Sequence, residues 1–462
     1  MTDTKAWARE QLASADFGDV RRVDRAIAML GRAAEHPAGQ LTQVFHDGAE
    51  LQAAYDFVEG AVPASSLVDA FADATLDAAS QSGFTYVVID GTSLTLTDRT
   101  KRKDFGSVGS RSLPTRGLKV IDAIGLSLDG VPLGLLDLHC WARGPKSTAS
   151  RFLRRRAGQT EVRHWVEVIE GVRDRVDKAG IRAHLVIDRE GDCAEILRAV
   201  GHDSGEFTIR AAQRQRVCAG KKRSLWQTMK RRPISGQHFV HVPKSSKRCS
   251  RTAVLDIRHT RVVLDLPDRQ QGVRVPFEVT VVWAKERGTP FGDEPLEWML
   301  LTSDRILKCA DAIAVIDRYC LRWRVEDFHR TWKRGRCRVE DSQLHDRDHV
   351  VRWATMLAAV ALRVERLKHL ARTEPDAPAT VELSLHEVNT LREAKRRGFT
   401  KRTERITDDI PNIRTAVRWI ARMGGFHGKE HVEPGAMTIG RGLQELLTLA
   451  RGAEIGLRLA RK

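Results

Sequence analysis

The chain has 462 residues, of which 42% are hydrophobic, so it is long enough for two or three folded domains and is not a disordered protein. Its 77 lysines and arginines outnumber 60 acidic residues, and the formal net charge of +17 favours a polyanionic partner, nucleic acid before an acidic membrane surface. No apolar run approaches the roughly 20 residues that span a bilayer, and the N-terminal segment lacks the apolar core of a signal peptide. We therefore expect a cytoplasmic protein with no membrane partner.

The cysteines narrow the kinds of site that the chain can hold. There are 7 of them, an odd number, and they are scattered without a C-x-x-C pair. A disulfide framework or a structural zinc site is not expected, and a reducing compartment fits this pattern. Any bound metal is expected to be held by carboxylates.

Residues 1 to 75 are predicted to form a helical N-terminal region. The stretch "DVRRVDRAIAMLGRAA" has apolar positions at helical spacing, with arginines between them. This basic face either lies in solvent or contacts DNA, and the sequence leaves both readings open.

Residues 76 to 211 are predicted to form the first part of an α/β core. From Phe84, "FTYVVIDGTSLTLTD" predicts strand, turn and strand, and Asp129-Gly130 predicts a hairpin between two further strands, giving three antiparallel strands. A helix at about 161 to 178 is followed by the strand "AHLVID", another helix and the strand "EFTIRA". Strand-helix-strand units predict at least one parallel strand pair.

The rest of the chain divides into three segments. Residues 212 to 296 are predicted to be a mostly β insertion, and residues 297 to 370 return to the core with the strand "LEWMLLTS" and a long helix. Residues 371 to 462 are predicted to be helical, with a break at Gly424-Gly425.

The long helix contains the stretch "YCLRWRVEDFHRTWKRG", residues 319 to 335. At about 100° per residue, Tyr319, Arg322, Glu326 and Lys333 fall within roughly a 60° arc and share one face. A separate apolar stripe is expected to pack on the sheet; it consists of Leu321, Val325, Phe328 and Trp332. The charged face is therefore expected to point into a cleft or into solvent.

Two functions are possible for this charged face. It could be a solvated ion-pair face of little energetic value. Alternatively, a carboxylate, cations and aromatic rings together suit a phosphodiester site, where the acid holds metal and the cations bind phosphates. Such a site needs further acids, and Asp90 and Asp188 each end an apolar strand before a glycine-containing turn, although either alone could be only a turn or N-cap residue.

These motifs together resemble the insertion-sequence-four family of DDE transposases. "DRYCLRWRVEDFHRTWK" carries the family's Y-x2-R-x3-E-x6-K signature. "VVIDGTSL" and "LVIDREGD" are similar to its first and second aspartate strands, "FGDVRR" to its N-terminal segment and "AVRWIARMGGF" to its C-terminal region. The similarity covers nearly all of the chain in the family's order.

The resemblance implies an RNase H-like (retroviral integrase-like) catalytic core with a β-rich insertion, between helical N- and C-terminal regions. It implies that two Mg²⁺ or Mn²⁺ ions are bound by Asp90, Asp188 and Glu326. It also implies that Tyr319, Arg322 and Lys333 bind the DNA backbone at the transposon end.

Three further residues receive roles from the resemblance. Trp298 and Trp323 are implied to hold a base flipped out of the stack during hairpin formation, although Trp298 in an apolar strand also fits a core position. Arg210 is implied to contact a phosphate. The chain departs from the family in "AAYDFVEG", where Asp56 and Glu59 stand in a motif that tends to be basic, so its end sequences are expected to differ.

The implied function is cut-and-paste DNA transposition: cleavage of transposon ends, through a hairpin, and strand transfer to target DNA. The implied partners are double-stranded DNA, namely terminal inverted repeats and target, and a second copy of the chain in a synaptic dimer joined by the C-terminal helices. No nucleotide cofactor is expected, because the sequence has no phosphate-binding loop. The alternatives are a nuclease of the same fold without strand transfer and a non-catalytic DNA-binding repressor or inhibitor derived from a transposase.

Overall fold

The computed structural model describes residues 3–110, 114–144, 160–220, 223–242, 249–268, 271–290, 292–398, 406–429 and 431–460. The chain folds as two compact units. Unit 1 comprises Met1–Phe84, Thr92–Pro145 and Arg324–Lys462, and unit 2 comprises Thr85–Gly91 and Lys146–Trp323. Strand β1 (Phe84–Thr95) and helix α10 (Trp323–Lys333) each contain residues of both units.

The N-terminal part of unit 1 is helical, as predicted. Its helices are α1 (Asp3–Gln11), α2 (Val20–Glu35), α3 (Gly48–Glu59) and α4 (Ala64–Ser80). Aspartate side chains begin two of them: Asp19 accepts a backbone hydrogen bond at the start of α2, and Asp47 accepts two at the start of α3.

The strands of unit 1 centre on β3 (Arg116–Leu126). β3 pairs with β2 (Gly106–Ser107) and antiparallel with β4 (Pro132–Trp141), and β1 lies on its other side. The predicted hairpin at Asp129-Gly130 is confirmed, because it joins β3 to β4 and Gly130 has the positive φ of 76° that a tight turn requires.

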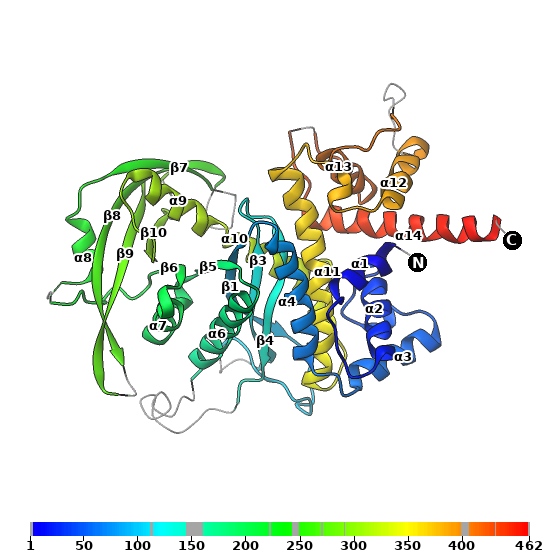
Figure 1. Cartoon of the computed structure of the whole chain (residues 1–462), viewed down its shortest axis with the longest axis horizontal. Helices are drawn as coiled ribbons and strands as arrows, with labels where there is room; N and C mark the ends of the chain where they lie inside the picture. The colour runs from blue at the N-terminus through cyan, green and yellow to red at the C-terminus, as the bar shows by residue number, and fades with distance from the viewer. Residues whose placement is uncertain are drawn as a thin grey trace. The chain divides into compact units, whose positions relative to one another are not determined.

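Helix α11 (Arg347–Thr373) is the central helix of unit 1 (Figure 1). It is buried along almost its whole length and contacts α2, α3, α4, β4, α13 and α14. The remaining helices of this part are α12 (Leu385–Gly398), α13 (Ile413–Met423) and α14 (Ala436–Ala460). The predicted break at Gly424-Gly425 is confirmed between α13 and α14, where Gly425 has a φ of 86°.

Unit 2 is a mixed sheet in the strand order β1-β5-β6-β10-β9-β8-β7. The strands after β1 are β5 (Arg182–Ile187), β6 (Glu206–Arg210), β7 (Gly236–Val242), β8 (Arg251–Asp268), β9 (Val273–Arg287) and β10 (Glu297–Thr302). β5 and β6 are parallel, which confirms the strand-helix-strand prediction, and the neighbouring pairs from β6 through β10 to β7 are antiparallel.

Helices cover both sides of the β5–β6 pair in unit 2. α6 (Val162–Lys178) contacts β5 and α7 (Ala194–Gly201) contacts β6, whereas α9 (Cys309–Cys320) packs on the other side, against β6, β8, β9 and β10 (Figure 1). The predicted β insertion is confirmed in its strands β7, β8 and β9, and it also contains the short helix α8 (Leu225–Lys230).

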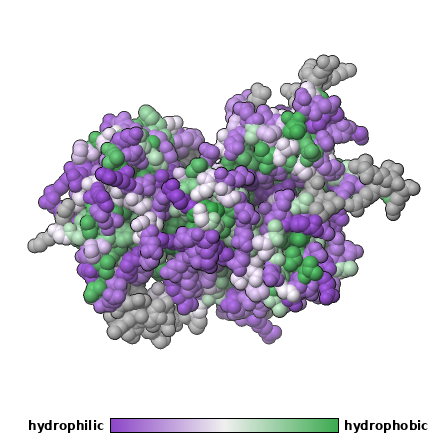
Figure 2. All heavy atoms as spheres, viewed as in Figure 1, coloured by the Kyte–Doolittle hydropathy of each residue, from purple (hydrophilic) through white to green (hydrophobic). Residues whose placement is uncertain are grey.

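Short 3-10 helices complete the described secondary structure. They are η1 (Leu41–Gln43), η4 (Val339–Asp341) and η5 (Ala379–Val381) in unit 1, and η2 (Arg189–Gly191) and η3 (His202–Ser204) in unit 2. Hydrophilic side chains cover most of the face seen in Figure 2. Among the described residues, no helix combines the length and apolar character that crossing a membrane requires.

Two local predictions are wrong. The turn predicted at Gly91 does not exist, because β1 continues through it from Phe84 to Thr95. The predicted long helix is interrupted: α9 ends at Cys320, and α10 begins at Trp323. The N–H groups of Leu321 and Arg322 bond to carbonyls three residues earlier, at 3.0 and 3.1 Å, and this tighter turn ends α9.

The segment before η1 packs closely against the segment after α10 within unit 1. The Trp353 indole donates to the carbonyls of Ala38 and Gly39, at 3.2 and 3.0 Å. A Cβ on Gly39 would lie 2.1 Å from the carbonyl oxygen of Arg338. Glycine is therefore required here for close backbone contact.

We predict that Gly39→Ala destabilises unit 1 by about 1–3 kcal/mol, because the backbone of Arg338 must shift to admit the methyl group. Thermal unfolding measures this as a midpoint several degrees lower. Gly48→Ala is the matched control, since a Cβ there meets nothing within 4 Å and alanine favours the helix. Equal midpoints for the two variants would contradict the role given to Gly39.

Candidate active site

Asp90 and Asp188 lie on neighbouring strands of unit 2. Asp90 is inside β1, and Asp188 directly follows β5 and begins η2. The residues before each carboxylate, such as Ile89 and Ile187, are fully buried. Packing of these apolar residues fixes the two strands, and so fixes where the carboxylates emerge.

The guanidinium of Arg322 lies between the two carboxylates. Its Nη1 is 3.7 Å from Oδ2 of Asp90 and 4.0 Å from Oδ2 of Asp188. Because one nitrogen is this close to both acids, the carboxylates face a common point. Arg322 is only 7% exposed, so the interaction is poorly screened by water.

Asp188 receives two further contacts. The hydroxyl of Tyr319 donates to Oδ1 of Asp188 at 2.9 Å, and Nη1 of Arg210 lies 3.9 Å from the same oxygen. Burial acts to raise the pKa of Asp188, but Arg322, the backbone N–H of Arg189 and Tyr319 outweigh it and hold the pKa below its ordinary value. The carboxylate is therefore ionised at neutral pH.

Tyr319 donates a hydrogen bond to Asp188 and does not lose its proton. Burial and, after it, the negative charge of Asp188 raise the pKa of its phenol, so the hydroxyl keeps its proton at any physiological pH. Tyr319 is 2% exposed. The sequence predicted that the charged face containing Tyr319 and Arg322 points into a cleft or into solvent. This prediction is wrong for these two residues, because both are buried. Their polar ends face the two carboxylates, and this attraction offsets part of the cost of burying them.

Gly91 leaves room for the side chains behind Asp90. A Cβ on Gly91 would lie 2.8 Å from the ring of Trp165 and 3.0 Å from a carboxylate oxygen of Glu190. Its N–H donates to Oδ1 of Asp90 at 2.9 Å. The glycine that suggested a turn thus serves close side-chain packing inside a strand.

Aromatic rings line the end of α9. The ring of Trp298, on β10, lies 5.5 Å from that of Tyr319 and 6.2 Å from that of Trp323, in both cases edge to face. Trp298 is 4% exposed, so in this state it is a core aromatic. Arg210, the last residue of β6, also donates to the carbonyl of Glu297 at 3.2 Å.

Glu326 and Lys333 belong to the part of α10 that lies in unit 1, and Glu326 is exposed. They share α10 with the buried residues Val325, Phe328 and Trp332, so this part of the apolar stripe is confirmed. Tyr319 precedes the helix break, and the prediction of one continuous face for all four signature residues is wrong.

Lys333 is held within unit 1 by two neighbours. Its Nζ donates to the hydroxyl of Thr92 at 3.1 Å and lies 3.8 Å from Oε1 of Glu340. Burial lowers the pKa of Lys333, and Glu340 acts in the opposite direction. Glu340 also accepts the backbone N–H of Thr95 at 2.8 Å. It links α10 to the end of β1, and its sequence context, "RVEDS", carries no signal for this role.

A buried acid in unit 1 was also missed by the sequence reasoning. Asp122 of β3 is fully buried, and its Oδ2 lies 2.6 Å from Nε2 of His329, one helical turn beyond Glu326 on α10. The signal was present, because "KVID" repeats the apolar-strand pattern of "VVID" and "LVID".

The donor atoms in unit 2 fit a divalent metal. Two carboxylates turned toward one cation provide the oxygen ligands that Mg²⁺ and Mn²⁺ prefer, and that of Asp188 is ionised. A second acidic group in unit 1, Asp327, Glu365 and His369, is of a different kind. The ammonium of Lys368 lies 2.7 Å from Asp327 and also contacts Glu365, so a side chain of the protein already supplies the cation.

Three family models match the chain. "Transposase DNA-binding" matches residues 4–62, "Transposase DDE domain" residues 157–363 and "Transposase Tn5 dimerisation domain" residues 359–461. The DDE match contains Asp188 and Glu326, whereas Asp90 lies outside it.

The matches also define the fold and the partners in general terms. The DDE domain implies an RNase H-like fold, in agreement with the mixed sheet between helical terminal regions, and the use of a divalent metal. The other two matches imply DNA and a second copy of the chain as partners. The chain belongs to the Tn5-like, insertion-sequence-four family of DDE transposases.

Proposed function

We propose that this transposase performs complete cut-and-paste transposition: it cleaves both transposon ends, through a DNA hairpin, and joins the 3′ ends to target DNA. The observation that carries the proposal is the pair of carboxylates, Asp90 and Asp188, which share the buried guanidinium of Arg322. Two carboxylates held at one point either take up a proton or acquire a cation, and a metal-dependent phosphodiester site uses carboxylates grouped in this way.

We propose Asp90, Asp188 and Glu326 as the ligands of two Mg²⁺ or Mn²⁺ ions. Glu326 is assigned from the signature motif and the DDE match. When bound, the ions supply an activated water or 3′-hydroxyl and stabilise the leaving oxygen. The strong ionisation of Asp188, which Tyr319 and Arg322 maintain, keeps this ligand ready to bind metal at neutral pH.

The cationic residues are proposed to bind the DNA backbone. Arg322, whose Nη1 lies within 4.0 Å of both carboxylates, would bind a phosphate oxygen of the DNA strand beside them. Lys333, held by Thr92 and Glu340, and Arg210 offer further cations for the same strand. Trp298 and Trp323 are proposed to stack on the flipped base of the hairpin.

The assembly proposed is a homodimer that holds two terminal inverted repeats in a synaptic complex, with helices of the C-terminal region at the interface. The proposed location is the bacterial cytoplasm, at the nucleoid, where the DNA substrate lies. Strand transfer conserves the number of phosphodiester bonds, so the reaction needs no nucleotide cofactor.

We predict that the protein joins a precut transposon end to a target plasmid in Mg²⁺. The end is taken from the genomic DNA that flanks the reading frame, and the measurement is gel detection of joined products. Products that are only hydrolysed would identify a nuclease instead. Binding of the end without cleavage under any metal condition would identify a repressor.

We predict that Asp188→Asn slows end nicking at least about 100-fold, because a neutral amide holds a divalent ion poorly. The affinity for end DNA, measured by gel shift, should change by less than about threefold, since phosphate contacts dominate it. The matched control is Asp317→Asn, which makes the same charge change at an exposed residue of α9. Wild-type nicking by Asp188→Asn would remove Asp188 from the active site.

We predict that Lys333→Met weakens DNA binding and lowers the slope of log K against log salt by about 0.9, the value for one lost phosphate contact. The control is Lys178→Met, since Lys178 on α6 is paired with Asp174 and its side chain is 74% exposed. Affinity titrations between low and physiological salt measure both slopes. An unchanged slope for Lys333→Met would show that Lys333 contacts no phosphate.

A further inference from the structure

Unit 2 contains a second set of polar residues, which precede residues of the candidate site along the chain. Each member stands four positions before a member of the site: Tyr86, His184 and Arg318 precede Asp90, Asp188 and Arg322. Side chains four residues apart share one face of a strand and, approximately, one face of a helix. Tyr86 and His184 therefore lie on the same strand faces as the two aspartates, roughly 13 Å earlier along each strand.

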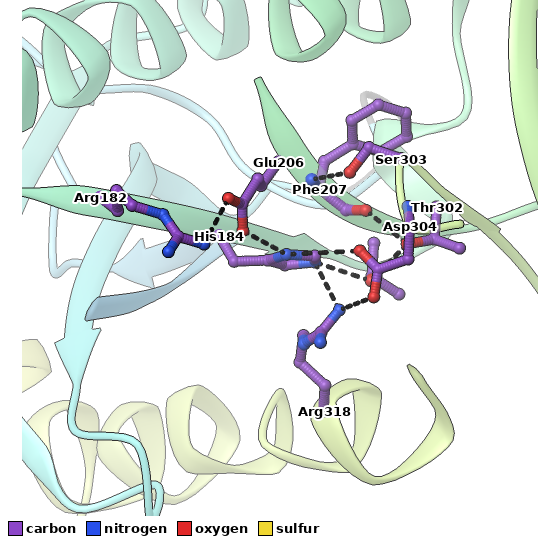
Figure 3. A network of polar contacts seen from close by, with 9 residues as sticks. Arg182, His184, Glu206, Phe207, Thr302, Ser303, Asp304 and Arg318 are labelled. Carbon is purple, nitrogen blue, oxygen red and sulfur yellow. Dashed lines mark hydrogen bonds and ion pairs between the residues drawn. The ribbon is translucent and has the colours of Figure 1, made fainter. Parts of the chain in front are cut away.

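Arg318 of α9 contacts both other members of this set, and its contact with His184 is drawn in Figure 3. Its Nη1 donates to Oδ2 of Asp304 at 2.7 Å and lies 3.2 Å from Nε2 of His184. Its guanidinium also lies over the ring of Tyr86, 5.6 Å from the centroid. Three elements, β1, β5 and the segment after β10, thus hold one side chain of α9.

The contacts define the protonation of His184. Arginine can only donate, so Nε2 of His184 must be the acceptor and the ring proton lies on Nδ1. Nδ1 faces Oε2 of Glu206 at 3.6 Å and Oδ1 of Asp304 at 3.9 Å. The interaction with His184 is the main cause that lowers the pKa of Glu206 to about 2, and Arg182 adds to the lowering.

The contact of Arg318 with His184 and Asp304 matters because of the residues that follow Arg318 in the chain. Tyr319 is the next residue, and Arg322 follows in the turn that ends α9. Both residues reach the carboxylates from this short segment. A rotation of α9 about its axis would move all three side chains together.

We propose that Arg318, bound by His184 and Asp304, is a positioning residue for DNA cleavage: it fixes the end of α9 so that Tyr319 and Arg322 face Asp188 and Asp90. This inference rests on the proposed function, because it assigns a role in the same reaction. Arg318 touches neither the carboxylates nor the proposed substrate contacts, so it acts only through its neighbours on α9.

The arrangement makes cleavage sensitive to acid. The groups that face His184 are Tyr86 on β1, Glu206 and Thr208 on β6, Asp304 after β10 and Arg318 on α9, with Arg182 beyond Glu206. Burial lowers the pKa of His184, Glu206 and Asp304 act to raise it, and Arg318 adds to the lowering.

The direction of the pH effect follows from this lowered pKa. The neutral ring and its contact with Arg318 are fully present above the ordinary histidine value of about 6.5. They are lost as the pH falls through the lower value of the folded protein, because an N–H on Nε2 would then face another donor and a like charge.

The test compares four variants in the nicking of a plasmid that carries the genomic DNA flanking the reading frame. Arg318→Met removes the guanidinium and keeps the aliphatic stem. His184→Leu removes the acceptor, whereas His184→Gln offers a carbonyl acceptor that does not titrate. Arg182→Met is the matched control, since its side chain is 72% exposed and it pairs with Glu206 without touching Arg318.

We expect Arg318→Met and His184→Leu to nick about tenfold more slowly at pH 8, a loss typical of one hydrogen bond to a charged group. Their affinity for end DNA should stay within about threefold of wild type, and Arg182→Met should nick normally. His184→Gln should keep the rate at pH 8 and lose the fall in rate that the wild type shows as the pH drops through the lowered pKa of His184.

Two results would overturn the inference. One is wild-type nicking by Arg318→Met, and the other is an acid limb in His184→Gln that matches that of the wild type. Thermal unfolding of each variant shows whether the chain is still folded, so that a misplaced helix can be told from a misfolded protein. If His184→Leu nicks slowly while His184→Gln nicks at the wild-type rate, a simple packing defect is excluded. A wild-type protein that never nicks would instead refute the proposed function.

Discussion

The repulsion between two carboxylates on adjacent strands is the constraint on which the rest of this site depends. Asp90 and Asp188 emerge from strands whose apolar residues are buried, so neither acid can move away from the other. Two like charges in such a place either take up a proton or acquire a cation. Arg322 supplies that cation within 4.0 Å of both acids, and Tyr319 adds a neutral donor to Asp188. The low pKa of Asp188 is the consequence.

This charge balance explains why the segment around Arg322 is not a continuous helix. A guanidinium that must reach two strands at once is held by the tight turn after α9, where the backbone bonds three residues back and not four. The break lets α9 pack on the sheet of unit 2, while α10 carries Glu326 and Lys333 within unit 1. Helical periodicity assumed one axis for all four signature residues, and so it could predict neither the break nor the burial of Tyr319 and Arg322.

Patterns that depend on local chemistry were read correctly from the sequence. The turn at Gly130, the parallel pairing of β5 and β6, the β insertion and the break after α13 all follow from turn residues and hydrophobic periods. The function of Gly91 did not follow, since only the tertiary structure shows the ring of Trp165 beside it. The pairing of His184 with Arg318 could not be predicted either, because 134 residues separate them along the chain.

The four V-I-D sequences of this chain show why a motif alone cannot locate the chemistry. They end at Asp90, Asp122, Asp188 and Asp317. Two of these acids pair with a histidine, Asp122 with His329 at 2.6 Å and Asp317 with His238 at 2.7 Å. The other two share an arginine and, with it, a common point. Each histidine contacts one of these carboxylates, whereas the arginine lies within 4.0 Å of two, so among the four acids only Asp90 and Asp188 are brought to one point by a shared partner. The partner of each aspartate, which the fold alone determines, separates the two acids that share a cation from the two that each contact one histidine.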